Sequence, residues 1–184
     1  IYAVLLRGSN NKVQGNFIGT DPAGAAAIAN GSGIRFTDGT GGSIGGTNAG
    51  EGNLISGNTN GGISSLSGTS GLSILGNLIG TNLAGSGAIA NGGGIDIDGS
   101  GHTVGGATVA ARNLISGNSA YGVSLMGSGQ LVYGNFIGTN AAGTAGIANG
   151  SGIGVYGTGH TIGGGSAGAR NVVSANSGGG LYAT

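Results

Sequence analysis

Two aspartates two residues apart are the clearest candidates for catalysis in this sequence. Asp96 and Asp98 stand in the segment GIDIDG, whose alternating aliphatic residues indicate a strand. Alternate strand residues project from one face about 7 Å apart, so the two carboxylates could hold a cation or act as acid and base on a polysaccharide. An aligned repeat carries Arg35 and Asp38 instead, so the pair belongs to one repeat alone. A solvated polar face is therefore favoured, with Asp96 and Asp98 as the runner-up catalytic pair.

Two histidines occupy equivalent positions in GSGHTVGG and GTGHTIGG. His102 and His160 are two repeats apart, which is roughly 10 Å in a stack of strands. One metal ion cannot join them directly, so we expect each to bond to the backbone of a turn. The sequence has no cysteine, which excludes thiolate metal sites and disulfides. We expect neither a metal nor a cofactor.

The composition limits the classes of partner. The net charge is zero and charged residues make up 5% of the chain, so binding of nucleic acid through bulk charge is not expected. No apolar run reaches the roughly 18 residues that a membrane-spanning helix needs. Glycine accounts for 49 of 184 residues, which fits either a disordered chain or a repeat with glycine at fixed turns. The constant spacing of Ile, Leu and Val favours the repeat.

The clearest copies of the repeat are GNFIGT, which begins at Gly15 and again at Gly134, and GNLIGT, which begins at Gly76. Diverged copies (NLISGN, NVVSAN) lie between them, and aligning all copies gives four columns of apolar residues. One column, which includes Phe36 and Leu66, alternates with small or polar residues as a strand does. Another is predicted to form the structural core and contains Ile18, Ile55, Ile79, Ile115, Ile137 and Val173.

These motifs resemble the right-handed parallel β-helix repeat family, the superfold of pectate lyases and of many bacterial surface proteins. The patterns GI.I.G…T.GG and GN.I.GN carry the resemblance over the whole chain. It implies an all-β fold, a right-handed parallel β-helix (solenoid) of about six turns of roughly 30 residues with three short strands per turn. Residues 1–184 then form a single domain. The family contains enzymes, adhesins and spacers, so the resemblance implies no particular activity.

One asparagine per turn precedes the last strand, and a second polar residue follows that strand. Stacked amides can hydrogen-bond along the axis, and Asn tolerates left-handed turns, so a structural ladder is preferred to a ligand-binding one. The predicted ladder is Asn16, Asn53, Asn77, Asn113, Asn135 and Asn171. The second set is Asp21, Asn58, Asn82, Asn118, Asn140 and Asn176.

The residues beside the core column should form an apolar stripe on the outside of the rod, since side chains alternate along a strand. This outer stripe contains Phe17, Leu54, Leu78, Leu114, Phe136 and Val172. Uncovered, it would be adhesive. We expect the loop aliphatics Ile28, Ile89 and Ile147 to fold over it, with cover by another molecule as the alternative. A minor alternative is an ice-binding surface, but Thr20, Thr81 and Thr139 recur only every second turn.

The leading hypothesis for function concerns the two ends. The chain opens in the strand IYAVLLRG and closes in GGGLYAT, with no polar cap at either end. We therefore expect a segment of a longer array or a subunit that stacks head to tail on itself. The hypothesis is a structural, non-enzymatic rod, spacer or filament subunit, extracellular or on the cell surface. The alternative is a carbohydrate-active enzyme (lyase, epimerase or hydrolase) or a polysaccharide-binding β-helix.

Overall fold

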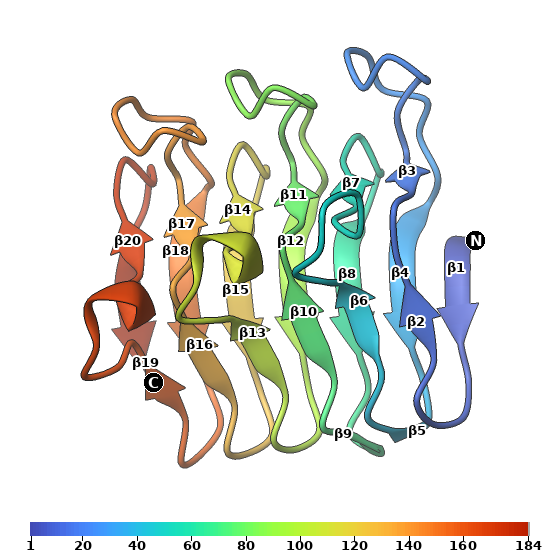
Figure 1. Ribbon diagram of the computed structural model, residues 1–184, viewed down its shortest axis with the longest axis vertical. Coiled ribbons are helices and arrows are strands. Elements are labelled where there is room, and N and C mark those ends of the chain that lie inside the picture. Colours follow the sequence, from blue (N-terminus) through green and yellow to red (C-terminus); the bar gives the residue numbers. More distant parts are fainter. Residues whose placement is uncertain (184) are drawn as a thin grey trace.

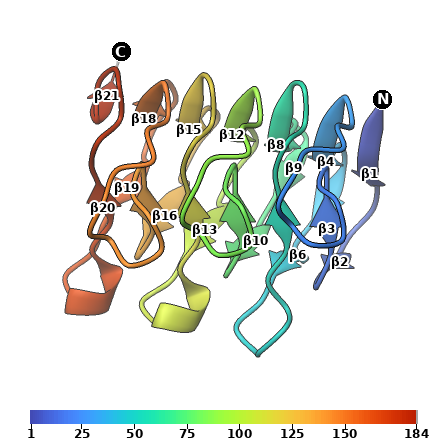
Figure 2. The ribbon, with the colours of Figure 1, turned by 90° about the horizontal axis from the view of Figure 1, so that it is seen from above.

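Alternating aliphatic and small residues fold each stretch of roughly 30 residues into three short strands, in a computed structural model that describes residues 1–183 (Figure 1). Each strand pairs in parallel with its counterparts in the neighbouring turns, which generates an all-β parallel solenoid of about six turns. Figure 2 shows one sheet as a row of strands along the whole rod. The predicted fold class is confirmed.

Three long sheets enclose the core. Sheet A contains β1 (Tyr2–Leu6), β4 (Ser32–Phe36), β8 (Gly61–Ser65), β12 (Gly93–Ile97), β15 (Tyr121–Leu125), β18 (Ser151–Val155) and β21 (Leu181–Ala183). Sheet B contains β2 (Lys12–Val13), β6 (Ser43–Gly45), β10 (Ser73–Leu75), β13 (Thr103–Gly105), β16 (Leu131–Tyr133) and β19 (Thr161–Ile162). Sheet C contains β3 (Phe17–Ile18), β7 (Leu54–Ile55), β11 (Leu78–Ile79), β14 (Leu114–Ile115), β17 (Phe136–Ile137) and β20 (Val172–Val173). A small sheet pairs β5 (Gly39–Thr40) with β9 (Thr69–Ser70).

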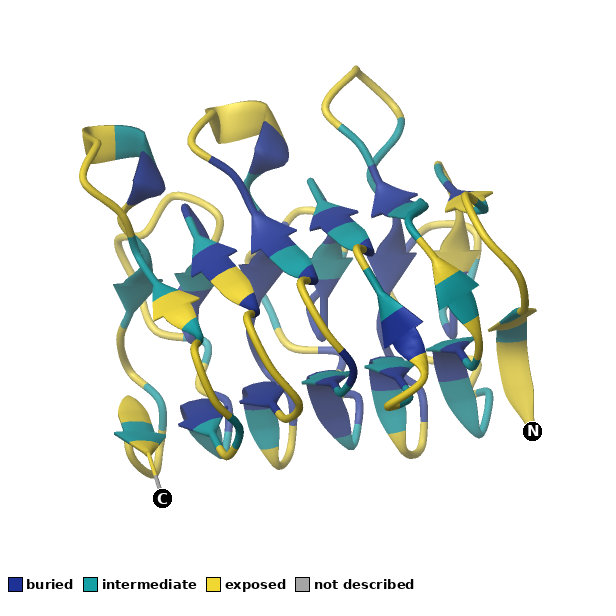
Figure 3. Ribbon diagram, turned by 90° about the horizontal axis from the view of Figure 1, so that it is seen from below, coloured by how far each residue is buried: buried dark blue, intermediate teal, exposed yellow. Residues whose placement is uncertain are grey.

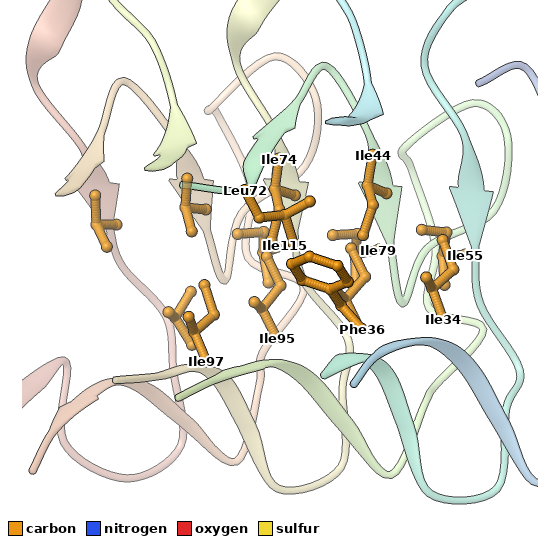
Figure 4. Close-up of a cluster of buried hydrophobic side chains, with 14 of the residues drawn as sticks. Ile34, Phe36, Ile44, Ile55, Leu72, Ile74, Ile79, Ile95, Ile97 and Ile115 are labelled. Atoms are coloured by element: carbon orange, nitrogen blue, oxygen red, sulfur yellow. The ribbon is translucent and has the colours of Figure 1, made fainter. Parts of the chain in front are cut away.

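The core is a stack of aliphatic side chains in register. Ile79 pairs with Ile55 and Ile115, and all three are fully buried (Figure 4). Val173, in the last full turn, is partly buried and packs against the same cluster. Each fully buried aliphatic side chain contributes about 1.5–3 kcal/mol of transfer free energy, so the stack stabilises the rod.

The predicted register is wrong at one position. Phe36 pairs with Ser65, so Leu66 lies one residue outside its predicted column. Ser65 is buried, and its hydroxyl donates to the Asp98 carbonyl at 2.8 Å and accepts from the Asp98 N–H at 3.1 Å. Leu72, 1% exposed, adds an aliphatic side chain to the core in the same turn. A hydroxyl with backbone partners is thus tolerated where alternation called for an apolar residue.

Two sets of loops leave the coils in alternate turns. The first set follows sheet C strands and spans residues 21–30, 82–91 and 140–149, at the top of Figure 1. The second set connects sheet B to sheet C, and in two turns it contains the 3-10 helices η1 (Val109–Ala111) and η2 (Ala167–Ala169). Figure 3 shows buried residues concentrated in the middle turns and exposed ones at both ends. Among residues 1–183, no helix is long and apolar enough to cross a membrane.

Candidate functional site

The six asparagines before the sheet C strands form one continuous ladder. In each step the backbone N–H and the Nδ2 group of one Asn donate to Oδ1 of the Asn in the next turn, as from Asn77 to Asn113 at 2.9 and 3.0 Å. The same geometry joins all members, from Asn16 through Asn53, Asn77, Asn113 and Asn135 to Asn171. Every amide therefore points the same way along the axis.

A second ladder exists, but its predicted membership is partly wrong. Asn91 donates to Oδ1 of Asn118 at 3.0 Å and accepts from the backbone and Nδ2 groups of Asn58. The ladder consists of Asn30, Asn58, Asn91, Asn118, Asn149 and Asn176. The asparagine that ends each first-set loop takes the ladder position, because the loop is inserted before it. Asp21, Asn82 and Asn140 instead accept backbone N–H groups inside their own loops.

The structure also explains why the GN.IG motif needs its second glycine. Gly80 has φ +89°, a conformation that L side chains rarely adopt, and a Cβ there would collide with the Asn118 side chain. The glycine therefore lets the second ladder pass close to the backbone. The recurring six residues thus combine a ladder amide, an outer apolar residue, a core aliphatic and a close-approach glycine.

The histidines lie at the corner between sheets A and B. His102 is fully buried; its Nδ1 accepts from the Leu72 N–H at 3.0 Å, and its Nε2 lies 2.8 Å from the Asp98 carbonyl. One turn later Gln130 takes the same position and accepts the His102 N–H through Oε1, and His160 Nδ1 accepts the Gln130 N–H. These contacts assign the histidines to turn backbone, and burial lowers the pKa of both. Among residues 1–183, no cluster of three metal-ligating side chains occurs.

The outer stripe is unevenly covered by the loops. Leu54 and Leu114 are 1% and 4% exposed, whereas Phe17 is 42% exposed. The covering contacts come from loop glycines: Gly24 lies against Leu54, and the equivalent glycines Gly85 and Gly143 lie against Leu114 and Phe136.

The expected cover by loop aliphatics is wrong for Ile28. It is 63% exposed at the N-terminal end of the rod, because no earlier turn lies beyond it in the described chain. Arg112 contributes cover that the sequence did not suggest, with its guanidinium 4.0 Å from the ring centroid of Phe136. The threonines cannot form an exposed array, because Thr81 and Thr139 are buried.

A hollow with several polar groups lies on the outer face of sheet A. It has a volume of about 350 Å³ and opens where Gly61 and Gly93 carry no side chain. The polar groups around it come from four successive turns and are Ser32, Arg35, Asn60, Ser64, Asp96 and Tyr121. Arg35 also lies 5.1 Å above the ring centroid of Tyr2, which holds the guanidinium at the hollow's edge. We call this feature the sheet A hollow.

Asp96 is the carboxylic acid of the sheet A hollow. Its Oδ1 is buried and has no hydrogen-bond partner among residues 1–183. Burial raises the pKa of Asp96; the neighbouring Ser124 side chain lowers it, and the charge of Asp98 raises it further. Burial and then the Asp96 charge raise the pKa of Tyr121 to about 12. The hollow therefore combines a half-buried carboxyl group, a phenol that is neutral near pH 7 and the Arg35 guanidinium.

Asp98 does not line the sheet A hollow. Its Oδ1 accepts the Gly99 N–H at 2.7 Å, so this carboxylate caps the turn after β12. The candidate pair is therefore split between a hollow and a turn. Sequence reasoning found Asp96 but missed Arg35 and Tyr121 as its neighbours, because stacking of different turns brings them together.

Comparison of the chain with models of protein families, with curated proteins and with solved structures gives no significant match.

Proposed function

We propose that the chain is a structural β-helix module, a rod that is lengthened by pairing its end turns with further turns of the same kind. The partner is a second copy, or more of the same array in one chain. Its proposed place is outside the cell or on the cell surface, as for the bacterial surface repeats that its motifs resemble. Kinship with the pectate-lyase-like family belongs to this proposal too.

The observation that carries the proposal is the polarity of the two Asn ladders. Among residues 1–183, Oδ1 of Asn16 and of Asn30 accepts no hydrogen bond, although their counterparts in every later turn do. At the other end, the backbone N–H groups of Asn171 and Asn176 lack the acceptor that earlier turns have among these residues. Acceptors at one end and donors at the other are complementary, so they support pairing head to tail.

The N-terminal end also has the shape to receive a turn. A hollow of about 490 Å³ opens there between Val4, Val13 and Ile18, with Asn16 and Asn30 on its rim. Another turn of the repeat would fill it with aliphatic columns in register and would complete both ladders. The edge strands β1, β2 and β3 would gain backbone hydrogen bonds by pairing with that turn.

The test of head-to-tail stacking removes the extra strand of sheet A. Sheet A has seven strands, whereas sheets B and C have six, so β21 lies beside β18 where β1 of a stacked copy would pair. We expect residues 1–176, which lack β21, to form rods in electron micrographs and concentration-dependent species in light scattering. Ala3 is exposed and lines the end hollow, so Ala3→Glu should abolish rods while Ala3→Ser retains them. Folded 1–176 that stays monomeric at every concentration would exclude stacking of separate copies.

A polysaccharide-binding strip on sheet A is the second candidate, favoured by the polar residues Arg35, Asp96 and Tyr121 around the sheet A hollow. Aromatic rings and polar groups that converge on a shallow hollow suit sugar hydroxyls. Affinity electrophoresis against a polysaccharide panel should show retardation that Asp96→Asn and Tyr121→Phe reduce and that Asp38→Asn does not. If the parent and all variants migrate equally on every polysaccharide, this role is rejected. If the parent releases sugar products from a polysaccharide and the Asp96 and Tyr121 variants do not, the strip is an enzyme active site.

A further inference from the structure

Four asparagines in this chain are each followed by glycine: Asn30, Asn60, Asn91 and Asn149. This dipeptide is chemically fragile, because a glycine nitrogen is not shielded by a Cβ and can attack the asparagine side chain. The reaction needs a side chain that can rotate toward the following nitrogen. The fold treats the four dipeptides differently.

Two of them are immobilised inside the second ladder. Asn91 and Asn149 are fully buried, and each side chain donates twice and accepts twice. The next nitrogen is held as well, since Gly92 N–H donates to the Asn58 carbonyl at 3.1 Å and Gly150 N–H to the Asn118 carbonyl at 3.1 Å. Neither the attacking atom nor the attacked carbon can move without opening the turn.

Asn30 has part of this protection. It belongs to the first turn and is half-buried, and Nδ2 donates to Oδ1 of Asn58 at 3.0 Å. No described donor reaches its own Oδ1, so its amide is held from one side only.

Asn60 has almost none. It is exposed, it belongs to neither ladder, and the contact of its amide is a single 3.4 Å hydrogen bond from Nδ2 to the Ser32 hydroxyl, which is also a surface group. Only its backbone is fixed, through its N–H to the Gly31 carbonyl and its carbonyl to Gly93 N–H, both at 2.7 Å. The side chain is therefore free on a rigid backbone.

We propose that Asn60 is a site of spontaneous deamidation on the folded rod, and that the ladders protect the other Asn-Gly dipeptides. After losing its proton, the Gly61 nitrogen forms a bond to Cγ of Asn60, and the Cγ–Nδ2 bond breaks with release of ammonia. Water then opens the resulting succinimide at either carbonyl, which leaves aspartate or isoaspartate. No oxidant, reductant or enzyme is needed.

The modification would alter the sheet A hollow. Asn60 lines that hollow together with Arg35 and Asp96, so deamidation places a second negative charge there. Isoaspartate also adds a carbon to the main chain immediately before β8. The hollow would therefore become more negatively charged as the protein ages.

The experiment incubates the full chain at mildly alkaline pH and 37 °C and follows each site by peptide mapping with mass spectrometry. We expect Asn60 to gain one mass unit more than about tenfold faster than Asn91 and Asn149, with Asn30 between them. The same chain in urea should react at similar rates at all four sites, which assigns the difference to the fold. Equal rates at Asn60, Asn91 and Asn149 in the folded chain would overturn the proposal.

Gly61→Ala is the matched control. Gly61 has no positive φ, and the nearest atom to an added Cβ would be the Gly93 carbonyl oxygen at 3.9 Å, so the fold accommodates alanine. This variant should keep the parent's circular dichroism and melting curve while Asn60 deamidates several-fold more slowly. If Asn60 reacts as fast beside alanine as beside glycine, attack by the residue 61 nitrogen is disproved.

Discussion

Oδ1 of Asn77 accepts two hydrogen bonds from Asn53, one from Nδ2 at 2.9 Å and one from the backbone N–H at 3.0 Å. Asn77 in turn donates to Asn113 and to the Ile44 carbonyl. A single fully buried amide thus joins three successive turns.

Replacing this amide should cost more than its size suggests. Asn77→Leu leaves two buried donors of Asn53 without an acceptor, and each orphaned group costs about 1–3 kcal/mol. We expect a large fall in urea midpoint by circular dichroism. The urea midpoint of Asn16→Leu, in the exposed first turn, should fall far less. A similar loss in both variants would mean that burial of the ladder is irrelevant to stability.

The core prediction concerns Ile115, which is fully buried between Ile79 and Ile137. Ile115→Asp places a charge in the stack and should destabilise by more than about 4 kcal/mol or prevent folding. Ile28→Asp, at an exposed loop position, is the control and should melt like the parent. An Ile115→Asp chain with the parent's thermal unfolding curve would refute the inward assignment.

Cover of the outer stripe predicts a contrast between two similar truncations. Leu114→Ala empties a site that is 4% exposed and should cost about 2–5 kcal/mol. Phe17→Ala removes a larger side chain that is 42% exposed and should cost less. Denaturant unfolding of both variants measures the difference, and the reverse order would show that the loops do not protect the stripe.

Burial of His102 predicts that stability falls in weak acid. Its pKa is lowered in the folded chain, so the unfolded chain binds the proton first, and stability is lost as the pH falls below the ordinary value of 6.5. Thermal melts from pH 8 to pH 5 should show this decline. Gln130 fills the same position one turn later, so His102→Gln should fold and show a smaller decline. An unchanged slope would assign the effect to other groups.

Asp96 predicts the opposite pH trend. Its pKa is raised, mainly by burial, so folding favours the protonated acid and stability is lost as the pH rises above the ordinary value of 3.8. Asp96→Asn should therefore unfold at higher urea than the parent at pH 7, with a gap that narrows toward pH 3. Asp98→Asn, which alters a turn cap, should not show this gain. A destabilised Asp96→Asn at pH 7 would mean that the carboxylate has a partner.

The fold could be predicted from sequence because each turn repeats the same physical problem. Ile18, Ile79 and Ile137 recur every second turn at nearly constant spacing, and only stacking in register buries them all. The predicted second ladder is wrong at Asn82 because the ten-residue loop 82–91 is inserted before the ladder position. Asn91, at the end of that loop, occupies the ladder position in the stack. The sheet A hollow could not be predicted, since Arg35, Asp96 and Tyr121 belong to different turns and none of them recurs in a neighbouring turn.

The alternation of the loops has a consequence for how such a chain changes in evolution. Gly24 leaves one turn and lies against Leu54 of the next, and Gly85 and Leu114 repeat the arrangement two turns later. A duplication or deletion of one turn would place two loops of the same kind in adjacent turns. An outer-stripe leucine next to them would then lose its covering loop and become exposed. Exchange of two turns at once preserves every contact, so viable lengths should differ by steps of roughly 10 Å.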